Sequence, residues 1–179
     1  KEGIDDNLFK ENKIDIIIHT ATFYGRNSGS DNEMIYSNLF LPQLLLQKAV
    51  ISKCPIFINT DTILDRYTSS YSLTKKQFND WLKFYSESET IKVVNLKLEH
   101  FYGPGASNSN FISLMINKML ANETPIELTK GEQNRDFLYI SDLLKVYDLI
   151  LKKISEFNDY HEFNIGSGVN TNLKYILKY

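Results

Sequence analysis

Apolar residues along the chain form short continuous runs separated by longer segments with helical spacing. The runs at 14–21, 54–60 and 91–100 read IDIIIHTA, CPIFINT and IKVVNLKLEH, and they are rich in isoleucine and valine. Continuous apolar runs of this length are typical of strands that are buried on both faces of a parallel sheet. We therefore predict three buried strands.

The segments between these strands carry apolar residues at helical spacing. A helix is predicted over 33–50, and Pro42 within it predicts a kink or a break. The other predicted elements are a helix that carries Tyr71 and Lys75 and continues through QFNDWLKFYSES, helices over 110–120 and 141–154, short strands over 126–128 and 135–140 around Gly131, and a last strand over 161–168 that ends in a glycine turn.

Strands that alternate with helices indicate βαβ units, and therefore an α/β fold with a Rossmann-like, doubly wound parallel sheet. After Gly103-Pro104-Gly105 the elements shorten and the pattern becomes mixed. We therefore expect a partial dinucleotide-binding domain over 1–103 and a small α/β substrate lobe over 104–179, interleaved with the last sheet strands. Ligands of such folds bind at the carboxyl ends of the strands.

The composition is that of a folded globular protein, with 42% hydrophobic and 23% charged residues among 179. A net charge of −2 without a long basic run argues against a nucleic-acid surface. No apolar stretch has the roughly 20 residues of a membrane helix, and the first residues lack the apolar core of a signal peptide. The single cysteine, Cys54, is expected to be buried and reduced, so we expect a cytoplasmic protein, and we expect no metal site.

No G-x-x-G-x-x-G loop occurs near the start, where only about 13 residues precede the first strand. A doubly wound nucleotide-binding domain begins with that loop and its first strands. Either the chain lacks such a first portion, or the domain does not bind a dinucleotide.

The segment SSYSLTKKQF places Tyr71 four residues before Lys75. Positions i and i+4 share one face of a helix, so both side chains can reach one pocket. Because an ammonium stabilises a nearby phenolate, such a tyrosine can exchange a proton with a sugar or alcohol oxygen. The spacing alone also fits an ordinary helix surface, and Lys76, about 100° around the helix, is expected to be a solvated surface residue.

Thr60 lies at the carboxyl end of the second strand, eleven residues before Tyr71. Its hydroxyl can hydrogen-bond the same substrate oxygen and hold it against Tyr71. A strand-end threonine that only satisfies backbone groups is the alternative.

Together with these residues, several motifs in order resemble the extended short-chain dehydrogenase/reductase superfamily, in its nucleotide-sugar epimerase, dehydratase and reductase branch. The motifs are IIIHTATFYGR, YSNLFLPQLL, FINTDT, YSLTK, LKLEHFYGPG, GEQNRDFLYISDL and FNIGSG. Within that branch the sequences of these motifs resemble those of CDP-abequose synthase-like and CDP-paratose synthase-like reductases.

The resemblance implies roles for individual residues. Thr60, Tyr71 and Lys75 match the catalytic residues, and Lys75 also matches the residue that binds the nicotinamide ribose. The remaining residues that match cofactor-binding positions are His19, Thr20, Ala21, Asn38 and Leu98. The residues that match substrate-binding positions are Asp61, Glu99, His100, which stands where many relatives have asparagine, and Arg135, which matches the arginine that clamps the substrate pyrophosphate.

The resemblance further implies reduction of the 4-keto group of a nucleotide-linked, CDP-type deoxyhexose with NADH or NADPH, in dideoxysugar and lipopolysaccharide biosynthesis. A 4-epimerase with tightly bound NAD is the alternative enzyme, and a non-catalytic fragment or regulatory relative is the alternative of another class. Related 4,6-dehydratases have Asp-Glu after the threonine, whereas here Asp61-Thr62 follows, which disfavours elimination. Without the resemblance, Arg135-Asp136 would be a surface ion pair. Dimers through the helix pair that contains Tyr71 are common in the family, so a homodimer is one expectation.

Overall fold

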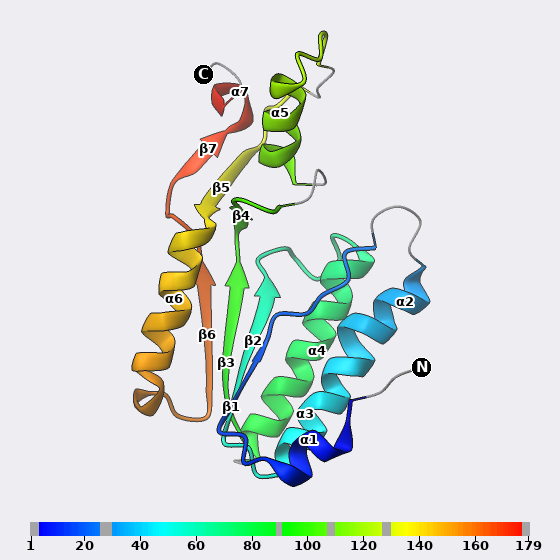
Figure 1. Cartoon of the computed structure of the whole chain (residues 1–179), viewed down its shortest axis with the longest axis vertical. Helices are drawn as coiled ribbons and strands as arrows, with labels where there is room; N and C mark the ends of the chain where they lie inside the picture. The colour runs from blue at the N-terminus through cyan, green and yellow to red at the C-terminus, as the bar shows by residue number, and fades with distance from the viewer. Residues whose placement is uncertain (1–3, 26–29, 89–90, 107–109, 127–129, 177–179) are drawn as a thin grey trace. The chain divides into compact units, whose positions relative to one another are not determined.

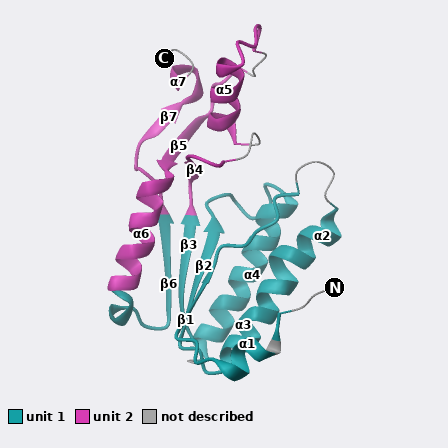
Figure 2. Cartoon of the chain, viewed as in Figure 1, with its two compact units in different colours: residues 1–97, 153–164 teal, residues 98–152, 165–179 magenta. Residues whose placement is uncertain are grey.

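The protein is described by a computed structural model that covers residues 4–25, 30–88, 91–106, 110–126 and 130–176. The chain divides into two compact units, the first formed by 1–97 and 153–164 and the second by 98–152 and 165–179 (Figure 2). The change of unit therefore falls a few residues before the expected boundary at 103, and 153–164 returns to the first unit. We describe each unit separately.

Unit 1 is built on a four-stranded sheet with the order β1-β2-β3-β6. Strand β1 is parallel to β2, with His19 opposite Asn59 at the end of the register, and β2, β3 and β6 run in the same direction (Figure 1). The predicted α/β class with a parallel sheet is confirmed. The strands are β1 (Ile16–His19), β2 (Ile56–Thr62), β3 (Lys92–Leu98) and β6 (Tyr160–Ile165).

The helix predicted over 33–50 is a continuous helical segment with a widened π-turn in its middle. Because proline lacks an N–H group and its ring clashes with the carbonyl four residues earlier, Pro42 disfavours a regular helix at this point. The backbone widens just before it, and the Leu41 N–H donates to the Tyr36 carbonyl, five residues back. The helices of unit 1 are α1 (Asp6–Glu11), α2 (Asp31–Ile35), η1 (Tyr36–Phe40), α3 (Leu41–Ile51), α4 (Ser70–Glu87) and η2 (Ile154–Glu156).

Helices α3 and α4 cover one face of this sheet (Figure 1). Their apolar side chains and those of the strands form one core, in which Cys54 is buried as predicted. The buried members are Leu46, Ala49, Cys54, Phe57, Phe78, Leu82, Ile91 and Val93. This core fixes α4, which carries Tyr71 and Lys75, against the sheet.

Unit 2 contains a three-stranded sheet with the order β4-β5-β7. Strands β4 and β5 are parallel, and β5 and β7 are antiparallel. The strand predicted over 91–100 is split, because β3 ends at Leu98 and β4 begins at His100; the strand predicted over 126–128 falls largely outside the described residues. The elements are β4 (His100–Tyr102), α5 (Phe111–Leu120), β5 (Asn134–Tyr139), α6 (Ile140–Lys152), β7 (Asn170–Asn172) and α7 (Leu173–Ile176).

Among the helices of the described ranges, none combines the length and the hydrophobicity that crossing a membrane requires.

The core of unit 1 makes a direct prediction for α3. Leu46 is 0% exposed and Ile51, near the end of the same helix, is 75% exposed. Replacing Leu46 with alanine should lower the free energy of unfolding by about 2–5 kcal/mol, because it leaves a cavity. The matched change Ile51→Ala should stay within about 0.5 kcal/mol. Urea denaturation of both variants measures the difference, and equal losses would contradict this description of the core.

Candidate active site

Helix α4 begins with a capping box that sets the position of its first turn. The Ser69 hydroxyl accepts the Ser72 N–H at 3.2 Å, and the Ser72 hydroxyl accepts the Ser69 N–H at 3.0 Å. These bonds satisfy N–H groups that a helix start leaves without partners. Tyr71 therefore lies in the first turn of α4, and Lys75 lies one turn later on the same face.

Lys75 is a buried cation, with 2% of its surface exposed. Its ammonium donates to the backbone carbonyl of Thr60, at the end of β2, over 2.5 Å. Burial lowers the pKa of Lys75 to about 8; Asp61 opposes this shift and Lys76 adds to it. The structure thus brings the predicted lysine to the backbone of the predicted threonine. The contact of the Thr60 hydroxyl with a substrate oxygen stays a prediction.

Tyr71 is half-buried, and its ring stacks on that of Tyr24. The ring centroids are 5.1 Å apart and the planes lie at 29°. Tyr24 belongs to the loop that follows β1, so this loop contacts the candidate proton donor. Sequence reasoning did not single out Tyr24, although it stands inside the quoted motif TATFYGR.

Asp61 and Lys76 form an ion pair that the sequence analysis did not foresee. The Asp61 carboxylate lies 3.1 Å from the Lys76 ammonium, and the two side chains are 0% and 14% exposed. The expectation that Lys76 is a solvated surface residue is therefore wrong, because its long side chain turns toward the sheet. The Asp61 side chain has no exposed surface, and its contact with substrate stays a prediction.

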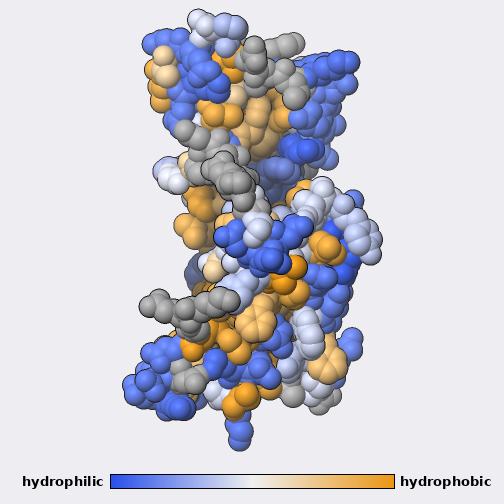
Figure 3. Space-filling model, turned by 90° about the vertical axis from the view of Figure 1, so that its right-hand side faces the viewer, coloured by the Kyte–Doolittle hydropathy of each residue, from blue (hydrophilic) through white to orange (hydrophobic). Residues whose placement is uncertain are grey.

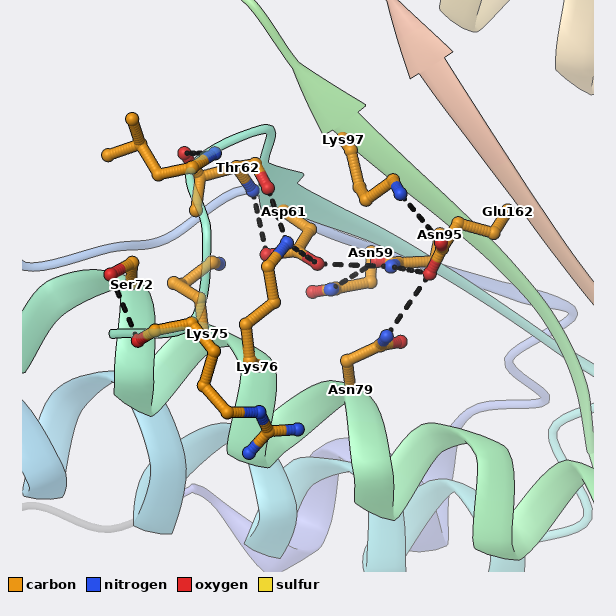
Figure 4. Close-up of polar contacts among 12 residues, drawn as sticks. Asn59, Asp61, Thr62, Ser72, Lys75, Lys76, Asn79, Asn95, Lys97 and Glu162 are labelled. Carbon is orange, nitrogen blue, oxygen red and sulfur yellow. Dashed lines mark hydrogen bonds and ion pairs between the residues drawn. The ribbon is translucent and has the colours of Figure 1, made fainter. Parts of the chain in front are cut away.

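Polar side chains form a continuous row across the sheet, on the face that packs against α4 (Figure 4). Asn59 donates to the Asn95 side-chain oxygen at 2.8 Å, and Asn95 donates at 3.2 Å to both Asp61 and Glu162. A buried amide without a hydrogen bond costs about 1–3 kcal/mol. The row therefore stabilises the sheet only while its members stay paired.

Glu162 ends this row on β6 and gathers donors from three elements. Its carboxylate accepts from Lys97 at 2.8 Å, from Tyr160 at 2.7 Å and from Asn79 of α4 at 3.1 Å. Burial would raise the pKa of Glu162, but the bonds from Lys97, Tyr160 and Asn95 outweigh burial and lower it to about 2. Burial and the carboxylate together raise the pKa of Tyr160. Glu162 is therefore ionised at neutral pH.

His19 is buried at the end of β1 and belongs to the same row. Its Nδ1 lies 2.9 Å from the Asn59 side-chain oxygen. Because the Asn59 amide nitrogen donates to Asn95, this oxygen is the acceptor, so Nδ1 carries the proton. The ring also packs on Phe57 and Phe78. Burial lowers the pKa of His19 to about 4, so the ring is neutral at pH 7.

Asn38 lies within the π-turn η1 and is buried. Its side-chain amide makes two bonds of 2.7 Å to the backbone of Phe23, accepting the N–H and donating to the carbonyl. Both ends of the Asn38 amide thus hold the loop after β1. Its place beside a cofactor stays a prediction.

The other predicted cofactor residues have contrasting surroundings. Thr20 and Ala21 are exposed directly after β1, where a ligand can reach them. Leu98 is buried at the end of β3.

The predicted substrate residues Glu99, His100 and Arg135 belong to unit 2 and are half-buried. His100 Nδ1 lies 3.6 Å from the Glu99 carboxylate. Burial and the nearby Arg135 charge lower the pKa of His100, although Glu99 opposes them. Arg135 donates to the Asn134 carbonyl at 2.8 Å.

Asp136 closes a turn of unit 2 and is not a surface residue. Its carboxylate accepts the N–H groups of Ser167 and Gly168, both at 2.8 Å, and the Ser167 hydroxyl at 2.6 Å. Burial opposes its ionisation, but these bonds outweigh burial and hold the pKa of Asp136 below its usual range. A Cβ on Gly166 would lie 2.4 Å from the carboxylate, so glycine is required there.

The sequence analysis missed Asn59, Asn79, Asn95 and Glu162. A signal for two of them was present, because Asn59 and Asn95 interrupt the apolar strands FINTDT and KVVNLKL. A polar residue inside a strand that is buried on both faces needs a buried partner. The partners come from separate elements, so the strands alone do not identify them.

Residues 5–166 match the model of the NAD dependent epimerase/dehydratase family. The chain is 33% identical over 169 residues to CDP-abequose synthase of Salmonella typhimurium, covering 91% of this chain and 56% of that protein. It is 35% identical over 173 residues to CDP-abequose synthase of Salmonella muenchen, covering 92% and 58%. The chain thus spans somewhat more than half the length of these relatives.

Solved structures with the same fold include UDP-glucuronic acid 4-epimerase from Bacillus cereus in complex with NAD. It superposes with a TM-score of 0.86 at 22% identity, over 97% of this chain and 59% of that one. UDP-glucose 4-epimerase from Thermotoga maritima with UDP-glucose gives a TM-score of 0.84 at 19% identity, over 97% and 62%. At these identities the similarity establishes the fold.

The buried neutral His19 predicts a loss of stability in mild acid. The unfolded chain binds a proton near pH 6.5 and the folded chain only near pH 4, so the free energy of unfolding falls across this window, by up to about 3 kcal/mol. His19→Asn, whose amide can replace the Nδ1 donor, should remove this part of the pH dependence, whereas His161→Asn on β6 should retain it. Urea denaturation at pH 7 and pH 4.5 measures it, and the Glu162 carboxylate, whose pKa is 4.5 in the unfolded chain, contributes equally to the parent and the variants. If the free energy of unfolding falls equally with pH in the parent and in His19→Asn, His19 is not the source of this pH dependence.

Proposed function

Because this chain belongs to the NAD dependent epimerase/dehydratase family, we propose that its protein reduces the 4-keto group of a CDP-linked deoxyhexose with NAD(P)H. The two Salmonella relatives are named CDP-abequose synthase and match over nine-tenths of this chain. Their names supply the substrate class, and the site supplies the chemistry.

The observation that carries the proposal is the position of Lys75. Its ammonium is buried, bound to the Thr60 carbonyl, and one helical turn from Tyr71. A buried cation costs free energy unless it has partners. A surface Tyr/Lys pair would not need this arrangement, whereas a proton-transfer site would.

We assign Tyr71 as the donor of the proton that the sugar carbonyl oxygen takes up when it becomes an alcohol. The Lys75 ammonium stabilises the phenolate that remains after the transfer. The Thr60 hydroxyl holds the sugar oxygen beside Tyr71. The ring of Tyr24, stacked on Tyr71, limits the directions in which the phenol can turn.

The residues of unit 1 fit a nicotinamide cofactor. An ammonium has three N–H groups, so Lys75 can donate to Thr60 and to ribose hydroxyls at the same time. Thr20 and Ala21 are exposed at the carboxyl end of β1, where ligands of parallel sheets bind. NAD(P)H, when bound, supplies the hydride.

Arg135 is assigned the substrate pyrophosphate, because a guanidinium binds phosphate oxygens through two parallel hydrogen bonds. We assign Glu99 and His100 to the sugar nucleotide as well. With its pKa lowered, His100 is a neutral group that can both donate and accept a hydrogen bond.

The strand end of β2 supports reduction over elimination. Thr62 replaces the glutamate that a dehydratase would use, and its hydroxyl accepts the Leu64 N–H at 3.3 Å. The neighbouring carboxylate, Asp61, is held by Lys76. Neither side chain is available as the acid or base of an elimination.

Tyr71→Phe in the full-length protein should lower kcat/KM for the 4-keto reduction by roughly 10²–10⁴-fold, because the proton donor is lost. Tyr67→Phe, at a tyrosine that is 87% exposed in the preceding loop, is the matched control and should keep full activity. Oxidation of NADPH in the presence of a CDP-linked 4-keto sugar measures both. An unchanged rate for Tyr71→Phe would refute the proposed mechanism.

The same assay separates reduction from epimerisation. A reductase consumes one NADPH for each sugar converted, whereas an epimerase regenerates its cofactor and shows no net consumption. Conversion of the sugar without loss of NADPH would replace the proposed function with epimerisation.

We further propose that the protein forms a homodimer through α4. The outer face of this helix carries Trp81 and Phe84, 42% and 61% exposed, which pack edge-to-face with Tyr85 beside them. On the face that Figure 3 shows, hydrophobic residues reach the surface in several places between hydrophilic ones. Adjacent aromatic side chains are enriched at the buried centres of interfaces.

A charge within this aromatic face should prevent dimerisation. Phe84→Glu should convert a dimer into a monomer, because an interface would bury the new carboxylate without a partner. Leu120→Glu on α5, at a residue with 76% exposure, should leave the mass unchanged. Sedimentation equilibrium measures the mass, and a monomeric parent protein would exclude the homodimer.

A further inference from the structure

The two adjacent lysines of α4 bind two carbonyls at the end of the same strand. Lys75 donates to the Thr60 carbonyl and Lys76 to the Thr62 carbonyl, each over 2.5 Å. Strand β1 ends opposite Asn59, so it offers no register partner to these later residues of β2. The lysines therefore donate to carbonyls of β2 at positions that lie beyond the end of β1.

Two ammonium groups on neighbouring residues repel each other, and the strand supplies the compensating charge. Asp61 stands between the two bound carbonyls, and its carboxylate lies 3.1 Å from Lys76. The carboxylate itself accepts the Thr62 N–H at 2.7 Å and the Asn95 amide at 3.2 Å (Figure 4). Groups of the sheet therefore fix the position of the Asp61 carboxylate independently of its contact with Lys76 on α4.

We propose that Asp61 and Lys76 are a positioning pair for the proposed active site: they hold the start of α4 on the end of β2, so that Lys75 stays on Thr60 and Tyr71 keeps its place. This inference rests on the proposed function only for its catalytic consequence. The pair acts on the protein without substrate as well, which allows a separate test.

The charges around Lys75 give the pair a measurable effect. From the strands, Asp61 and the neutral His19 face Lys75; on its own helix, the neighbours are Tyr71 and Lys76, with Tyr24 stacked on Tyr71. Asp61 favours the charged form of Lys75, and Lys76 disfavours it. Neutralising Lys76 should therefore raise the titration midpoint of Lys75, and neutralising Asp61 should lower it.

The test is an NMR titration of the full-length protein labelled with ¹³C at the lysine ε-carbons, with Lys75 assigned by loss of its signal in Lys75→Met. Lys76→Met should raise the Lys75 midpoint, and Asp61→Asn should lower it, each by roughly 0.5–1 pH unit. Asp80→Asn is the matched control, because Asp80 on the same helix pairs with Arg66 of the loop after β2 but is exposed. It should leave the midpoint unchanged. Folded Lys76→Met and Asp61→Asn proteins with the parent midpoint would overturn the proposal.

Lys76→Met alone leaves a buried carboxylate without its cation, which can prevent folding. The combined variant Asp61→Asn/Lys76→Met removes both charges and should fold. In it kcat should fall at least about tenfold with little change in KM, because orientation and not binding is lost. A folded double variant with the parent kcat would overturn the proposal. If the parent protein has no reductase activity, the proposed function is refuted. Opposite shifts of the Lys75 titration midpoint in Lys76→Met and Asp61→Asn would still support the positioning pair.

Discussion

The packing of helix α4 against the sheet of unit 1 depends on burying charge between the helix and the strands. Lys75 is buried, and moving an ammonium out of water is costly unless carbonyls and a carboxylate surround it. The end of β2 meets this requirement with the Thr60 carbonyl, which accepts from Lys75, and with the charge of the Asp61 carboxylate, which favours the charged form of Lys75. The rest of the arrangement follows: Asp61 needs Asn95, and Asn95 needs Asn59 and Glu162.

This dependence links chemistry with architecture. The polar row crosses β1, β2, β3 and β6 and contacts α4. The apolar core packs against α3 and against the later turns of α4. Apolar burial supplies the stability, and the hydrogen bonds select one register between helix and sheet. Separating the buried Asp61–Lys76 pair would leave a buried charge without its partner, so the pair opposes a shift of the helix along the sheet.

The sequence predicts the buried strands and the main helices well, because long apolar runs and helical spacing report burial directly. It also predicts that Tyr71 and Lys75 share a face, since this follows from helix geometry. It fails for Lys76, because an angle around a helix does not show where a long, flexible side chain ends. The partners of Asn95 come from distant segments, so only the folded chain identifies them. Short strands such as β7 leave little pattern to detect, since three residues define no periodicity.

The π-turn η1 has a consequence for the loop after β1. The widened turn lets the Asn38 amide occupy both backbone groups of Phe23, as a neighbouring strand would. The Phe23 N–H can exchange its hydrogen with water only when its bond to the Asn38 side chain opens. The exchange rate of this one loop amide therefore reports how firmly the π-turn holds the loop.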